Sequence, residues 1–128
     1  MTQARKVVVV ADEVGVYHCM SRCVRRAFLC GEDAYTGRNY AHRRAWVRER
    51  VQHLSALFGI EVFAYSVMSN HLHLVLRNRP DHAAQWSDYE VAERWCRVCP
   101  GKAALEQGEP FDANKLKVLL NDAAMLEV

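Results

Sequence analysis

Residues 62–76 read VFAYSVM, then SN, then HLHLVL, which is the pattern of two short strands joined by a tight turn. Successive side chains of a strand point to opposite faces, so His71 and His73 share one face. The three leucines that alternate with them line the other face. Two imidazoles on one face can hold one metal ion, and this stretch is therefore the first candidate for a functional site.

The elements before this strand pair predict the fold class. Residues 16–21 have the aromatic and small residues of a first strand, and apolar residues recur at helical spacing over 40–58. Asn39 is a plausible N-cap for that helix, and Gly59 is expected just past its end. The order β-α-β-β predicts an α+β fold, a small α/β sandwich whose central antiparallel sheet carries helices packed on it.

The segments at the two ends of the chain are expected to be peripheral. The β-branched run at 7–10 predicts an edge strand or an extended arm, and residues 81–85 are linker-like. Ser87 is a good N-cap for a helix over 88–98. Helical structure is also expected at 102–107 and 111–126, the latter as an acidic, peripheral tail.

The charge is divided unevenly along the chain. Residues 1–80 carry 12 Lys and Arg against 6 Asp and Glu, a net charge of +6, whereas residues 81–128 carry a net charge of −4. We therefore describe the chain as a basic core (1–80) and an acidic, mainly helical extension of the same domain (81–128). Eleven of the twelve cations are arginine, which suits bidentate phosphate contacts and favours a polyanionic partner.

Length and composition limit the class of protein. A chain of 128 residues with 51% hydrophobic and 25% charged residues is typical of one soluble globular domain. The apolar runs are far shorter than the roughly 20 residues of a membrane span, and the sequence shows no signal peptide. We expect a cytoplasmic protein without membrane contact, whose five cysteines are reduced.

The histidine pair can be interpreted as structural as well as functional. A His-x-His pair in a strand is often structural or incidental, but here the strand has a leucine side and a polar side. A divalent ion on the polar side could polarise a phosphodiester and stabilise charge on its oxygens. The third ligand is not specified by the sequence. His18, in the first strand, is either a neighbour of the pair or a histidine in or near the core.

Three other motif interpretations fail on the sequence. The CxxC pair Cys96 and Cys99 lies near the end of a predicted helix rather than at its start, so a structural role is favoured over redox chemistry. Nucleotide hydrolases with a histidine triad need a third alternating histidine, but position 75 is valine and position 69 is serine. Amidohydrolases that open with His-x-His need a barrel of about 250 residues.

The chain resembles the single-strand DNA transposases of the HUH class, and in particular the REP-associated tyrosine transposases of bacteria. The resemblance covers about residues 14–100. It is carried by Tyr17-His18 with Ser21-Arg22, by His42-Arg43-Arg44 with Trp46, and above all by the segment AYSVMSNHLHLVL at 64–76.

This resemblance implies a set of functional roles. His71 and His73 would bind Mg²⁺ or Mn²⁺, and the partner would be single-stranded or hairpin DNA, with the protein acting as a homodimer. A tyrosine would attack the scissile phosphate to form a 5′-phosphotyrosyl link. The residues expected to contact DNA are Arg22, Arg25, Arg26, Arg43, Arg44 and Asn70.

The chain departs from the family at the nucleophile. The family carries its tyrosine on a helix well downstream of the histidines, whereas Tyr89 is the only tyrosine after the pair here. Its place on the apolar side of a predicted helix favours a core role, so it is a weak candidate. The sequence leaves two functions open: the amino-terminal part of a transposase that is incomplete for cleavage, or a non-catalytic remnant that binds DNA hairpins or dimerises with an intact copy.

Overall fold

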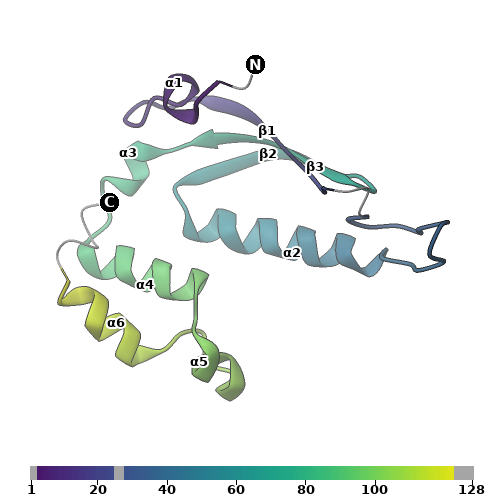
Figure 1. Ribbon diagram of the computed structural model, residues 1–128. Helices are drawn as coiled ribbons and strands as arrows, with labels where there is room; N and C mark the ends of the chain where they lie inside the picture. Colours follow the sequence, from purple (N-terminus) through teal and green to yellow (C-terminus); the bar gives the residue numbers. More distant parts are fainter. Residues whose placement is uncertain (1–2, 25–27, 123–128) are drawn as a thin grey trace. The chain divides into compact units, whose positions relative to one another are not determined.

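A computed structural model describes residues 3–24 and 28–122 of the chain (Figure 1). The chain divides into two compact units, residues 1–81 and 82–128. The first unit contains the sheet and its long helix, and the second unit is helical.

A three-stranded antiparallel sheet organises the first unit. The strands are β1 (Val16–Arg22), β2 (Ile60–Val67) and β3 (His71–Asn78), in the spatial order β1-β3-β2. Helix α2 (His42–Leu57) connects β1 to β2 and follows one face of the sheet (Figure 1). The predicted α+β class and the β-α-β-β order are confirmed.

The β2–β3 turn is held by the segment that follows β1. The backbone N–H of Cys23 donates to the carbonyl of Asn70 at 2.8 Å, and the N–H groups of Leu29 and Cys30 donate to the carbonyl of Ser69 at 2.5 and 3.2 Å. The Cys30 thiol, which is fully buried, also donates to the Met68 carbonyl at 3.1 Å. The turn carbonyls are thus satisfied by protein groups, which ties the loop after β1 to the hairpin.

Asn78 ties β1 to β3 at the other end of the sheet. Its side-chain oxygen accepts from the N–H of Gly15 at 2.6 Å, and its own backbone N–H donates to the Gly15 carbonyl at 3.1 Å. Its amide nitrogen donates to the carbonyl of Glu13 at 2.9 Å. The register of β1 on β3 is therefore set just before β1 begins.

Helix α2 begins later than the sequence predicts. Asn39 is not the N-cap: the cap position is Ala41, and the Asn39 side-chain oxygen accepts from the Ala41 N–H at 2.8 Å. Asparagine thus makes the local turn just before the helix rather than capping it. At the other end the chain becomes extended at Phe58, one residue before Gly59.

Two expectations for peripheral segments are wrong. The run at 7–10 forms no strand, because residues Arg5–Val8 make one helical turn (α1), in which the Val9 N–H donates to the Arg5 carbonyl at 2.8 Å. The β-propensity of valine depends on packing against neighbouring strands, and the valines of this segment are exposed. The expected linker begins with the short helix α3 (Pro80–Ala83), since proline suits the first position of a helix.

The second unit consists of α4 (Asp88–Val98), α5 (Lys102–Gln107) and α6 (Ala113–Leu120). Ser87 caps α4 as predicted, in a reciprocal capping box with Glu90. The hydrophobic core of this unit contains Ala92, Cys96, Leu116 and Leu119, with Phe111 and Leu120 packed against it. Residues 123–126 of the expected acidic helix lie outside the described residues.

The two cysteines of the CxxC pair, Cys96 and Cys99, lie in the second unit. Cys96 is fully buried in the core, and burial raises the pKa of its thiol, whereas Cys99 is exposed at the helix end. A raised pKa disfavours the reactive thiolate. The geometry is therefore that of a structural cysteine. Over the described part of the chain, no helix has the length and apolar character to cross a membrane.

Candidate functional site

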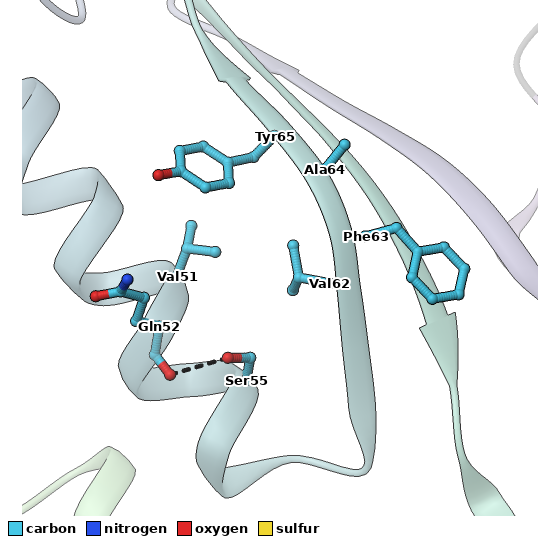
Figure 2. A pocket seen from close by; sticks show the side chains of 7 residues that line it. All are labelled: Val51, Gln52, Ser55, Val62, Phe63, Ala64 and Tyr65. Atoms are coloured by element: carbon cyan, nitrogen blue, oxygen red, sulfur yellow. Dashed lines mark hydrogen bonds between the residues drawn. The ribbon is translucent and has the colours of Figure 1, made fainter.

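The histidine pair lies on the sheet face that α2 does not follow. Val62 and Tyr65 of β2 point toward α2, and the pairing places them opposite Leu76 and Leu74 of β3 (Figure 2). Since residues opposite each other in a sheet share a face, the leucines of β3 face the helix side. His71 and His73 occupy the alternate positions of β3, so their side chains project from the opposite, open face.

His18 of β1 completes a cluster of three histidines on this face. Its Nε2 lies 2.8 Å from Nδ1 of His73, within hydrogen-bond distance. The two rings are stacked, with centroids 5.0 Å apart and planes inclined by 12°. His18 is exposed, so its interpretation as a neighbour of the pair is confirmed and its alternative placement in the core is wrong.

His71 is oriented by the residue before it. Its Nδ1 lies 2.6 Å from the side-chain oxygen of Asn70. The His71 and His73 rings meet edge to face, with centroids 4.8 Å apart. The Asn70 side chain, which the resemblance assigns to DNA contact, therefore makes a hydrogen bond to a candidate metal ligand.

The surroundings of His71 favour its neutral form. Desolvation lowers the pKa of His71, and the nearby charges of His73 and Arg22 lower it further. Arg22 is the cross-strand partner of His71, at the end of β1. A neutral imidazole is the form that coordinates a metal ion.

The donor set fits a divalent cation only in part. Nδ1 is engaged in a hydrogen-bond contact on both rings, so Nε2 is the ring nitrogen of His71 and of His73 that is left to coordinate a metal. Within residues 3–24 and 28–122, no group of three or more His, Cys, Asp or Glu side chains could hold a metal ion. A cation here would have two imidazole ligands from this chain and would take its other ligands from water or phosphate oxygens.

The predicted DNA-contacting arginines are not gathered at one place. Arg22 lies beside the histidines, and Arg25 and Arg26 lie outside the described residues. Arg43 stacks on the Tyr40 ring at 4.2 Å and donates to the carbonyl of Phe28 at 3.3 Å.

Arg44, on the first turn of α2, reaches the sulfur of Cys30 at 3.8 Å. Both α2 arginines thus contact the loop after β1. The structure places them on the helix, away from the histidine face.

Two further arginines of the first unit are held in ion pairs. Arg77 and Arg79 both bind Glu61, and Arg79 also binds Asp81 at 2.7 Å. The hydrogen bond from Arg77 is the main cause that lowers the pKa of Glu61. Part of the basic excess of residues 1–80 therefore stabilises the end of the sheet.

Tyr89 is not a core residue. Its side chain is 51% exposed, because the residues that α4 buries are Ala92 and Cys96, one and two turns further along. It lies in the second unit, whereas the histidines lie in the first. The expectation of a core role is wrong.

Strand pairing adds two residues that the sequence did not single out. Met20 of β1 and Ser66 of β2 are both cross-strand partners of His73, one from each side, and both are exposed. They therefore flank His73 on the open face. The sequence does not predict that these two residues flank His73, because the local sequence of a strand does not specify its register against a strand that is distant in the chain.

The pocket in Figure 2 is separate from the histidine cluster. It has a volume of about 420 Å³ and is lined by α2 and β2. Its lining residues are Val51, Gln52, Ser55, Val62, Phe63, Ala64 and Tyr65. The lining contains no histidine or carboxylate, so the histidine face is the better candidate for a functional site.

In comparisons with known proteins, no family model, curated protein or solved structure matches this chain. The resemblance to single-strand DNA transposases stays a hypothesis that rests on the residues themselves.

We expect His71 to titrate below the ordinary histidine pKa of 6.5, and Arg22→Gln to raise its midpoint by removing a positive neighbour. Between the two pKa values the unfolded chain binds more protons, so the free energy of unfolding falls as the pH drops below 6.5. NMR titration of the imidazole C–H signals measures the midpoint. Arg48→Gln, an exposed change on α2, is the control; equal midpoints in both variants would contradict the role of Arg22.

Proposed function

We propose that the chain is a DNA-binding domain of the single-strand DNA transposase type. It would hold a divalent cation with His71 and His73 and bind single-stranded or hairpin DNA over the open sheet face. The single observation that carries this proposal is the histidine cluster, in which Nδ1 of His71 lies against Asn70 and Nδ1 of His73 lies against His18. A bound Mg²⁺ or Mn²⁺ would polarise a phosphodiester oxygen.

The electrostatics of the same face support an anionic ligand. Arg22 lies opposite His71 at the end of β1, and its guanidinium can contact a phosphate through two N–H groups. Imidazole donors suit Mn²⁺ better than Mg²⁺, because Mg²⁺ prefers oxygen ligands and keeps its waters. We therefore propose Mn²⁺ as the tighter of the two ions.

The second candidate function is a module that binds DNA hairpins without cleaving them. The observation that favours it is that only one tyrosine, Tyr89, follows the histidine pair in the sequence. For either function we propose a homodimer, as the resemblance implies, and a cytoplasmic location, as the absence of a signal peptide in the sequence suggests. Light scattering of the purified chain tests the dimer.

We expect the wild-type chain to bind Mn²⁺ and the double variant His71→Ala/His73→Ala to lose that binding, because both imidazole ligands are removed. Isothermal titration calorimetry measures the affinity. His42→Ala removes an exposed histidine on α2 and serves as the matched control, with wild-type affinity. If the double variant binds Mn²⁺ as the wild type does, the histidine pair is not the metal site.

Affinity for single-stranded DNA should fall as salt rises, since each phosphate contact releases counterions. Arg22→Gln should weaken binding and reduce the slope of log K against log salt by about 0.7, the value for one lost contact to a single strand. Fluorescence anisotropy at several salt concentrations measures both quantities. Arg48→Gln is the control, and an Arg22→Gln slope equal to that of the control would place Arg22 outside the interface.

Covalent capture tests whether this chain cleaves DNA by itself. With labelled hairpin DNA and Mn²⁺ we expect no adduct that survives SDS, because the histidines alone supply no nucleophile for a phosphotyrosyl link. An adduct that disappears in Tyr89→Phe would instead establish cleavage by this chain, with Tyr89 as the nucleophile.

A further inference from the structure

The two members of the histidine pair differ in what holds their Nδ1 atoms. Nδ1 of His71 faces the side-chain oxygen of Asn70, which can only accept a hydrogen bond, so His71 carries its proton on Nδ1. Its Nε2 is then a free lone pair. Asn70 alone is sufficient to prepare His71 as a ligand.

Nδ1 of His73 faces Nε2 of His18, and an imidazole nitrogen can either donate or accept. Two arrangements satisfy this contact. In one, His73 donates from Nδ1 and keeps a lone pair on Nε2. In the other, His18 donates from Nε2, and His73 then carries its proton on Nε2, where it cannot bind a cation.

We propose that His18 is a positioning residue for His73: it accepts the Nδ1 proton of His73 and so presents the Nε2 lone pair to a cation. This inference rests on the proposed metal site and names the group that prepares one of its two ligands. Ligating histidines usually donate their other ring N–H to a carboxylate, a carbonyl or water. His18 provides the equivalent acceptor through its Nε2.

The geometry distinguishes this role from that of a third ligand. His18 Nε2 is 2.8 Å from Nδ1 of His73, which is not the ring atom left to face a cation. The stacked rings, inclined by only 12°, place the two imidazoles side by side. The described residues also contain no group of three or more such side chains suited to a metal.

The backbone explains why position 18 can serve this purpose. In the β1–β3 pairing Met20 is directly opposite His73, and His18 is two residues away on the same face. Diagonal neighbours at this spacing are within reach of long or aromatic side chains. The contact therefore depends on the β1–β3 register, which Asn78 and the turn contacts hold at the two ends of the sheet.

The test combines imidazole NMR with metal titration on the full chain. Long-range ¹H–¹⁵N correlation of ¹⁵N-histidine protein, at a pH above the ordinary histidine pKa of about 6.5, reports which nitrogen carries the proton. With Mg²⁺ present, His73 should carry its ring proton on Nδ1. In His18→Ala, His73 should shift toward the form protonated on Nε2, and His71, held by Asn70, should not change.

The Mn²⁺ affinity of His18→Ala should fall by about 10-fold or more, the usual effect of removing such a partner. His18→Gln keeps an acceptor oxygen and should recover part of both the affinity and the tautomer. His42→Ala is the control and should match the wild type. A purely structural role for His18 would not predict rescue by glutamine together with a tautomer change confined to His73.

Two results would overturn the proposal. The first is a His73 tautomer that is the same in the wild type and in His18→Ala. The second is a Mn²⁺ affinity of His18→Ala that equals the affinity of the wild type, provided that the wild type binds the ion. If the wild type binds no metal, the proposed function fails by itself, and the tautomer comparison in metal-free protein still decides whether His18 accepts from His73.

Discussion

The structure depends on the register of β3 between its two neighbours. Because side chains alternate with period two, a slip by one residue would move His71 and His73 to the side that faces α2 and expose the leucines. Two sets of hydrogen bonds oppose such a slip: the Ser69 and Asn70 carbonyls with the loop after β1, and Asn78 with Gly15. The backbone pairing of the strands therefore fixes the geometry of the candidate site.

The charges of the first unit are used in several ways. Arg77 and Arg79 pair with Glu61, and the two α2 arginines contact the loop after β1. These contacts use cations that a count of charges would assign to a nucleic-acid surface. Arg22 differs because it lies opposite His71, where its charge also favours the neutral, metal-binding form of that histidine.

In the proposed function, the open face would bind metal and DNA rather than cleave DNA by itself. Hydrogen-bond contacts engage Nδ1 of both candidate ligands, and Arg22 lies opposite His71. Tyr89, the only tyrosine after the histidine pair, is exposed and belongs to the other compact unit. The proposed metal and DNA binding uses residues of the first unit, whereas cleavage would need a nucleophile as well.

The sequence by itself determined the elements and the face of the histidines. Period-two alternation at 71–76, helical spacing at 40–58 and the Ser87 cap are local signals, and local hydrogen bonds and burial enforce them. The helical turn at Arg5–Val8 went unpredicted because the β-propensity of valine depends on packing against neighbouring strands. Only the tertiary structure decided that His18 meets His73 and that Arg22 meets His71. These contacts join strands about fifty residues apart, and backbone hydrogen bonds common to all residue types set their register.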